Sequence, residues 1–351
     1  MRGLATTGLP GVKPVTVIHS ENVAPREAAL IDVHYIESGQ SRIERISVGR
    51  PVNFDRIVTV SVEDTAPFLS NGRKQDLSIR GLARAAFYGA AAIQANAAQA
   101  LRFDGPIIDS RAVESNNMAH LLLEVVPCVL HARRILGCQV SLLTERLQAP
   151  FRNLLDAFCI PQISVWRNVE ANFIKVRGVR GMAVYDLIGY PQCASSVSLS
   201  SPYRGVDFAS SIGFERVFLA RRGIRSLANH DDVERLVRKF GYKTVFMEDY
   251  SVRDQLSIGT RANHVVAIHG AAMAFLALND EIESVVELTP PHVYHDLFPL
   301  CLAPPAKQYH LVISEFDQAV IHSGWSAIAY HKSRPFAADL TLLKESLASV
   351  H

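Results

Sequence analysis

The sequence predicts an α/β protein made of two domains, and three observations support this fold class. The chain has 351 residues, 48% of them hydrophobic and 20% charged, so it is long enough for two hydrophobic cores. Short apolar runs alternate with helix patterns along the chain, as in α/β folds. A Ser-rich stretch at 195–201, just before Pro202, is typical of a linker. We therefore expect one domain over 1–200 and a second over 201–351.

The first domain is expected to begin with short β-like runs separated by Gly, Pro and Asn. An Ala-rich stretch without Pro at 81–103 predicts a long helix. Polar residues at 115–117 offer N-caps for a second helix over 118–136. The remaining predicted elements are strands at 15–19, 57–62, 106–109, 139–143 and 163–166, a helix at 147–158 and a hairpin within 172–185.

The second domain shows a simpler pattern of five buried strands separated by helices. Connections of only a few residues favour a doubly wound parallel sheet. One helix ends at Gly241, where glycine suits the C-terminal cap. The predicted strands are 215–220, 244–247, 265–268, 285–288 and 308–313, and the predicted helices are 231–240, 251–261, 271–278, 294–302 and 337–350.

A strand, turn, helix and strand unit at 265–288 organises the second domain. Its first strand leads into His269, Gly270 and Ala271, and the two small residues allow a backbone to approach a ligand. The N–H groups and the positive dipole end of the following helix attract an anion. A plain βαβ unit with a tight turn explains the same residues, so the neighbouring charges decide between the two interpretations.

Charged residues are predicted at the same edge of this sheet. Ligands of such sheets bind beyond the carboxyl ends of the strands. Arg221 and Arg222 follow one strand, and Glu287 lies near the end of another. The arginines suit the phosphates of a nucleoside diphosphate, and the carboxylate suits ribose hydroxyls. Taken alone, the arginines also fit a solvated strand end, and Glu287 also fits a helix cap.

A histidine and a glutamate four residues apart lie on the second helix of the first domain. His120 and Glu124 share one face of a helix that is otherwise rich in Leu and Val. A carboxylate one turn away fixes the tautomer of an imidazole and increases its basicity, as a general base on a sugar hydroxyl requires. Two alternatives stay open: Glu124 is itself the base, or the pair is structural.

Composition argues against several other classes. A net charge of +2 without a dominant Lys or Arg block argues against nucleic-acid binding. Five widely spaced cysteines without a Cys-x-x-Cys pair indicate neither a disulfide framework nor a zinc site. No Asp-x-Asp triplet occurs, so no metal site and no cofactor are expected. Neither a signal peptide nor a membrane span is predicted, which favours a cytoplasmic location and leaves room for peripheral membrane contact.

Several short motifs, in their order and spacing, resemble those of glycosyltransferase family 61. They are Asn-x-x-His-x-Leu-x-Glu (117–124), Phe-Leu-Ala-Arg-Arg (218–222), Asn229 with Asp231 and Asp232, Glu248 with Asp249, Gln255, Ala-Ile-His-Gly-Ala (267–271) and Val-Val-Glu-Leu (285–288). The resemblance implies two facing Rossmann-like domains of the GT-B kind with a cleft between them. It also implies a nucleotide-sugar donor and inversion at the anomeric carbon without a required metal.

Two departures from the family pattern affect the donor site. The family usually continues Gly-Leu-Thr-Asn after His-Gly-Ala, where this chain has Ala-Met-Ala-Phe at 272–275. The usual Ser before the arginines is Ala220 here. The missing hydroxyl and amide would remove donor contacts and shift the donor preference.

The combined prediction is an inverting glycosyltransferase of bacterial surface polysaccharide synthesis. The second domain would bind the donor through the residues named at its sheet edge. The first domain would bind a glycan or lipid-linked glycan acceptor beside Asn117 and supply the base. Two alternatives remain, namely a nucleotide-sugar epimerase of similar fold and a nucleotide-sugar-binding protein without catalysis.

Overall fold

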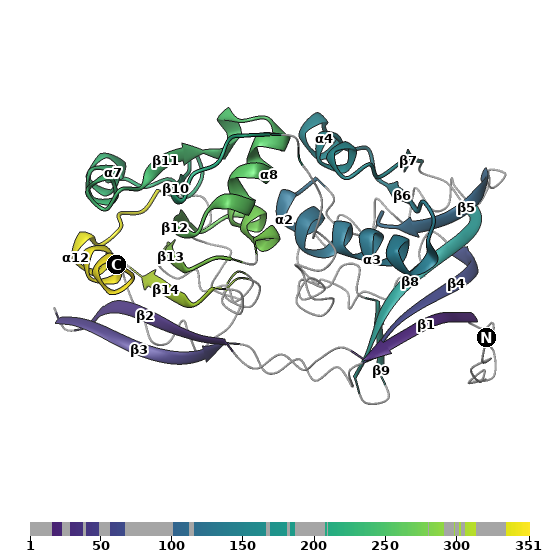
Figure 1. Cartoon of the computed structure of the whole chain (residues 1–351), viewed down its shortest axis with the longest axis horizontal. Helices are drawn as coiled ribbons and strands as arrows, with labels where there is room; N and C mark the ends of the chain where they lie inside the picture. The colour runs from purple at the N-terminus through teal and green to yellow at the C-terminus, as the bar shows by residue number, and fades with distance from the viewer. Residues whose placement is uncertain are drawn as a thin grey trace. The chain divides into compact units, whose positions relative to one another are not determined.

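The computed structural model forms two compact α/β units, each with its own seven-stranded sheet (Figure 1). The first unit contains Met1–Ala24 and Asn53–Val197, and the second contains Pro25–Val52 and Ser198–His351. The structure describes residues 16–22, 29–37, 40–48, 57–66, 101–111, 116–165, 169–180, 183–186, 208, 210–279, 281–290, 298, 302, 306–313 and 335–351. The predicted α/β class is confirmed.

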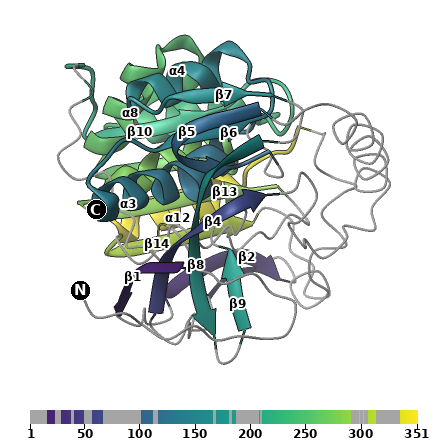
Figure 2. The ribbon, with the colours of Figure 1, turned by 90° about the vertical axis from the view of Figure 1, so that its right-hand side faces the viewer.

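The sheet of the first unit is mixed. Its strands are β1 (Thr16–Asn22), β4 (Ile57–Ala66), β5 (Leu101–Asp109), β6 (Ser141–Thr144), β7 (Gln162–Ser164), β8 (Val169–Arg180) and β9 (Ala183–Asp186). Strands β8, β5, β6 and β7 pair in parallel, whereas β1, β4 and β9 are joined by antiparallel pairing. Figure 2 shows the long strand β8 beside β4 and β9. The pairing of β8 with β9 confirms the hairpin predicted within 172–185.

The helix predicted at 118–136 forms, but with a change of hydrogen-bond register. It consists of α2 (Met118–His120), a π-helical turn η1 (Leu121–Val125) and α3 (Val126–Leu136). The amide of Val126 bonds the carbonyl of Leu121, five residues back. Pro127 lies two residues past the π turn and has no N–H to donate, so the regular α-helical ladder is already interrupted there. Another helix of this unit, α4, spans Ala149–Ala157.

The second unit contains the predicted parallel sheet. Its strands are β10 (Arg216–Ala220), β11 (Lys243–Phe246), β12 (His264–Ile268), β13 (Ser284–Thr289) and β14 (Gln308–Ile313). All four neighbouring pairs among them are parallel, in the spatial order β11, β10, β12, β13, β14. The order reverses between β10 and β12, which is the topological switch point where ligands of such sheets bind.

An N-terminal hairpin extends this second sheet. Strand β2 (Ala29–Glu37) pairs in parallel with β14, and β3 (Gln40–Val48) pairs antiparallel with β2. The hairpin therefore adds to the domain that was expected from residues 201–351 alone. The position of the domain boundary near residue 200 stays a prediction.

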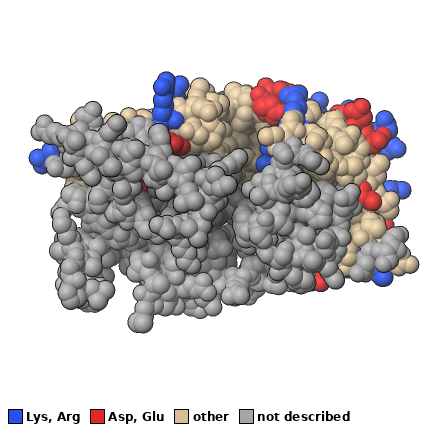
Figure 3. All heavy atoms as spheres, turned by 180° about the vertical axis from the view of Figure 1, so that it is seen from behind, with Lys and Arg blue, Asp and Glu red and all other residues tan. Residues whose placement is uncertain are grey.

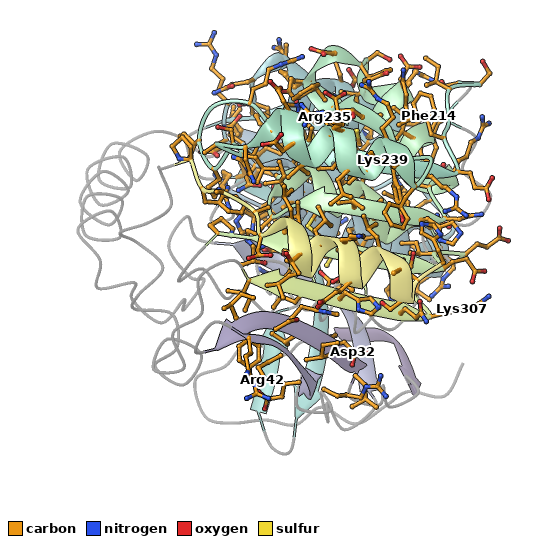
Figure 4. All side chains as sticks on the ribbon, turned by 90° about the vertical axis from the view of Figure 1, so that its left-hand side faces the viewer. Asp32, Arg42, Phe214, Arg235, Lys239 and Lys307 are labelled. Atoms are coloured by element: carbon orange, nitrogen blue, oxygen red, sulfur yellow. The ribbon has the colours of Figure 1, made fainter. Side chains whose placement is uncertain are left out.

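The two faces of the second sheet are covered by different helices (Figure 1). Residues of alternate parity along β10, β12, β13 and β14 form one buried cluster with α7 (His230–Lys239) and α12 (Leu340–Ser349). Figure 4 looks onto this face, with α12 across the sheet and Arg235 and Lys239 on α7. Because side chains alternate along a strand, Glu287 and Tyr309 point to the other face, where α8 (Val252–Arg261) lies.

Two element predictions need correction. Leu101–Phe103, expected in a helix, belong to β5, because Leu101 and its neighbour pair with β8. The helix after β12 is the 3₁₀ helix η3 (Ala271–Leu278). Eight residues span about 16 Å as a 3₁₀ helix but only about 12 Å as an α-helix. A return along a five-residue strand of about 16 Å therefore favours the 3₁₀ form.

Other predicted elements lie wholly or mainly outside the described residues. These are the helix at 81–100, the linker at 195–201 and most of the helix at 294–302, of which Phe298 and Leu302 are described and helical.

Two buried histidines join the hairpin to the parallel sheet. His34 of β2 and His310 of β14 are 1% and 4% exposed, and His34 Nε2 lies 2.8 Å from His310 Nδ1. Burial is the main cause that lowers the pKa of both imidazoles, and it takes His310 to about 4. Asp32 and Glu345 partly offset this for His34, while Arg45 opposes protonation of His310.

We therefore expect acid to destabilise the protein before its carboxylates titrate. Each histidine binds a proton more readily in the unfolded chain, where its pKa is near 6.5, than in the folded chain. The stabilisation is therefore complete above pH 6.5 and is lost as the pH falls toward 4, by an amount on the order of 3 kcal/mol. Urea unfolding from pH 8 to pH 5 measures it. The variant His310→Gln should show a flatter pH dependence, and an unchanged slope would contradict the assignment.

Candidate active site

The switch point brings together residues that are far apart in the sequence. Arg221 follows β10 and His269 follows β12, and Arg221 Nη1 donates to the carbonyl oxygen of His269 at 3.4 Å. A Cβ on Gly270 would lie 2.2 Å from the same Nη1 atom. Position 270 therefore needs a glycine for the guanidinium to occupy this place. The predicted meeting of Arg221, His269 and Gly270 at one sheet edge is confirmed.

Another arginine near this edge, Arg225, was missed by the sequence analysis. Arg225 lies in the turn after β10 with a φ of 62°, a left-handed conformation that is uncommon for a residue other than glycine. Its Nε atom is buried and has no hydrogen-bond partner among the described residues. Burial, and next the charge of Arg221, lower the pKa of Arg225 to about 10.

Arg221 and Arg225 therefore form a pair of mutually repelling cations. Burial also lowers the pKa of Arg221, and the charge of Glu248 only partly offsets it. A buried polar group without a partner is costly, and one explanation is a ligand that supplies the missing acceptor. We call Arg221, Arg225 and residues 269–271 the switch-point rim.

Arg222 is placed differently from its neighbour. Its guanidinium makes two hydrogen bonds to Asp249, of 2.6 and 2.8 Å, and lies 3.9 Å above the ring centre of Phe246. The bond to Asp249 raises the pKa of Arg222, and its side chain is 53% exposed. Its charge is already balanced by a carboxylate, so the predicted phosphate contact of Arg222 is untested, and we expect it to contribute less than Arg221.

Ala271 begins the 3₁₀ helix η3 beside Arg221. The first turn of η3 is closed by the amide of Met273, which bonds Gly270 O at 3.0 Å. No side chain of the described residues caps this helix. The start of this helix is thus close to Arg221, as an anion site requires, and the helix predicted at 271–278 is of the 3₁₀ type.

Glu287 is buried below this rim, and both its oxygens are used. His269 Nδ1 bonds Oε1, and the hydroxyl of Tyr309 donates to Oε2. Glu287 is 1% exposed, His269 4% and Tyr309 3%. The alternative that Glu287 caps a neighbouring helix is therefore wrong. Its expected contact with ribose stays a prediction, although a buried carboxylate with two partners is poorly placed for it.

The first unit places its candidate residues on one helix. Glu124 is 1% exposed and lies in the π turn η1, while the side chain of His120 is 29% exposed. His120 Nδ1 bonds Glu124 Oε1, and the buried Oε2 of Glu124 has no partner among the described residues. The Oδ1 atom of Asn117 accepts from the amide of Ala119 at 3.0 Å, which makes Asn117 the N-cap of α2. The predicted pairing of His120 with Glu124 is confirmed, whereas its catalytic role stays a prediction.

On the face shown in Figure 3, Lys and Arg of the described residues lie among Asp and Glu instead of gathering in a separate basic patch. Within the same described part of the chain, no three His, Cys, Asp or Glu side chains are grouped as ligands for a metal ion.

None of the described helices combines the length and the apolar character that crossing a membrane requires.

Two mixed α/β units, one with a parallel sheet and a cationic switch point, make this a protein with Rossmann-like sheets. The family model of Glycosyltransferase 61 matches residues 118–281. The match agrees with the family that the motifs predicted, and a glycosyltransferase 61 domain at 118–281 indicates an enzyme that transfers a sugar. No curated protein matches the chain. The matched range contains His120, Glu124 and the whole switch-point rim, and it ends before Glu287 and Tyr309.

Proposed function

We propose that the protein is an inverting, metal-independent glycosyltransferase. It would move a sugar from a nucleoside diphosphate sugar to a hydroxyl of a glycan or lipid-linked glycan acceptor during synthesis of a bacterial surface polysaccharide. The observation that carries the proposal is the Arg221 and Arg225 pair at the switch point, in which Arg225 has a buried, unpartnered Nε and Arg221 lies against the backbone of residues 269 and 270.

The departing diphosphate is the group that this rim suits. Charge builds on the diphosphate as the bond to the anomeric carbon breaks, and fixed cations stabilise that charge. Arg221 and Arg225 would supply them without a metal ion, and the backbone N–H groups at the start of η3 would add donors. Binding a dianion would also remove the mutual repulsion of the two arginines.

The acceptor side would be supplied by the first unit. Inversion requires a base that removes the acceptor proton from the face of the sugar opposite the leaving group. The half-exposed imidazole of His120, held by buried Glu124, suits this task, and Glu124 is the alternative base. The two units would adopt the GT-B arrangement, with the acceptor bound near Asn117. The enzyme would act in the cytoplasm.

We expect uridine diphosphate (UDP) or guanosine diphosphate (GDP) to stabilise the protein in the presence of a chelator. At one hundred times the dissociation constant, the nucleotide should add about 2.7 kcal/mol to the unfolding free energy. Thermal unfolding with EDTA, and then with added magnesium or manganese, measures this. Stabilisation that appears only with the metal would contradict the metal-independent mechanism. A transfer assay with a labelled donor then separates a transferase from an epimerase, which needs no acceptor, and from a protein that only binds.

A further inference from the structure

Three buried side chains on three neighbouring strands form a hydrogen-bonded chain below the switch-point rim. Tyr309, at the start of β14, donates its hydroxyl to Glu287 on β13. The second oxygen of Glu287 bonds His269 at the end of β12. A carboxylate only accepts hydrogen bonds, so the proton between Glu287 and His269 lies on Nδ1 and the tautomer of His269 is set.

The chain of contacts continues to Arg221. The carbonyl oxygen of His269 accepts from Arg221 Nη1 at 3.4 Å, and the amide of His269 donates to Leu288 O at 3.0 Å. Phe298 packs edge-on against the imidazole, with ring centres 5.3 Å apart. His269 is thus held through both its side chain and its backbone, and its carbonyl oxygen accepts the hydrogen bond of Arg221.

This geometry argues for an indirect role of Glu287. It is 1% exposed, and each oxygen already has a buried partner. Reaching a ribose hydroxyl would require Glu287 to break one of these bonds and leave a buried group unsatisfied, which is costly.

We propose that Tyr309 and Glu287 are positioning residues of the donor site. They hold His269, and through its carbonyl oxygen they hold Arg221, in the place that receives the donor diphosphate. This inference rests on the proposed function. It assigns a role to Tyr309, which lies outside the range matched by the family model.

The variant Tyr309→Phe tests this directly, because it keeps the ring and removes only the hydroxyl. Losing a hydrogen bond to a charged group should loosen His269 and weaken UDP binding about tenfold. Titration calorimetry with UDP, or with GDP if the wild type prefers it, measures the dissociation constant well below the melting temperature of each variant.

Tyr242→Phe is a control for the removal of a buried tyrosine hydroxyl. Tyr242 is 3% exposed, as Tyr309 is, but its hydroxyl has no hydrogen-bond partner among the described residues, and it precedes β11 at the opposite edge of the sheet from the rim. Removing this hydroxyl should leave the UDP dissociation constant unchanged. Glu287→Gln, of similar volume, should weaken UDP binding at least as much as Tyr309→Phe, and it serves as the test if Tyr309→Phe does not fold.

A double-mutant cycle gives a result that a purely structural role would not. If Tyr309 acts through Arg221, Tyr309→Phe should change the UDP dissociation constant by less than about twofold in an Arg221→Ala background. A full tenfold effect in that background, or normal UDP binding by Tyr309→Phe alone, would overturn the inference. Absence of UDP and GDP binding by the wild type would instead overturn the proposed function, and this inference with it.

Discussion

Replacing the base should lower sugar transfer by about 10² to 10⁴-fold while donor binding stays nearly normal. We expect this for His120→Ala and for Glu124→Gln. His120 carries a partly exposed imidazole, and its Nδ1 is held by a carboxylate that is itself buried in the π turn η1. Such π turns are frequent at functional sites, and here the turn fixes Glu124 directly behind His120.

The two variants also distinguish the two candidate bases. If His120 is the base and Glu124 positions it, His120→Ala should cause the greater loss of turnover. If Glu124 is the base, the order reverses. Turnover at saturating donor and the UDP dissociation constant are measured separately, because loss of the base should change only the first.

Another His–Glu pair of the same spacing offers a matched control. His230 Nε2 lies 3.9 Å from Glu234 Oε2 on α7, and both side chains are similarly exposed, at 26% and 28%. His230→Ala should leave turnover near that of the wild type. Near-normal transfer by both His120→Ala and Glu124→Gln would show that their pair is structural and that the base lies elsewhere.

The local pattern of apolar residues predicted those parts of the fold that depend on residues close together in the sequence. The strands β10, β12 and β13 are short, mostly apolar runs with helices between them, and a parallel sheet follows from that pattern. The pairing of β2 with β14 joins residues more than 270 positions apart, such as Asp32 and His310. The sequence of β2 has the character of an ordinary strand and does not specify which sheet the strand joins.

The site residues that depend on the local pattern were predicted as well. Arg221, His269 and Gly270 follow strands directly, so strand order alone brings them to one edge. Arg225 lies five residues past the end of β10, in a turn that begins at Gly223. Gly223 has a φ of 69°, and Arg225 itself is in the left-handed region. Neither that conformation nor its burial beside Arg221 has a local sequence signal. The spacing of four residues after a strand-end arginine is the one pattern that could have suggested it.

The three arginines should differ in their effect on nucleotide binding. Arg221→Ala and Arg225→Ala should each weaken UDP binding by about 10- to 150-fold, the range for losing one charge-assisted hydrogen bond of about 1.5 to 3 kcal/mol. Arg222→Ala should change it much less, because Arg222 is exposed and its charge is balanced by Asp249. Arg222 is thus the matched control, since it adjoins Arg221 in the chain and carries the same charge.

Calorimetry on the three variants, with melting temperatures measured in parallel, also tests why the two buried arginines lie together. Burial and, next, the charge of Arg221 lower the pKa of Arg225. Removing either arginine relieves this repulsion, so neither variant should be much less stable without ligand. A large loss of UDP affinity without a large loss of stability marks a ligand site, whereas the reverse marks a structural pair. Arg225→Lys should restore binding only in part, because a lysine keeps the charge but has no Nε–H and no planar fork. If Arg222→Ala alone abolished binding, the diphosphate would lie toward Asp249 and the rim assignment would be wrong.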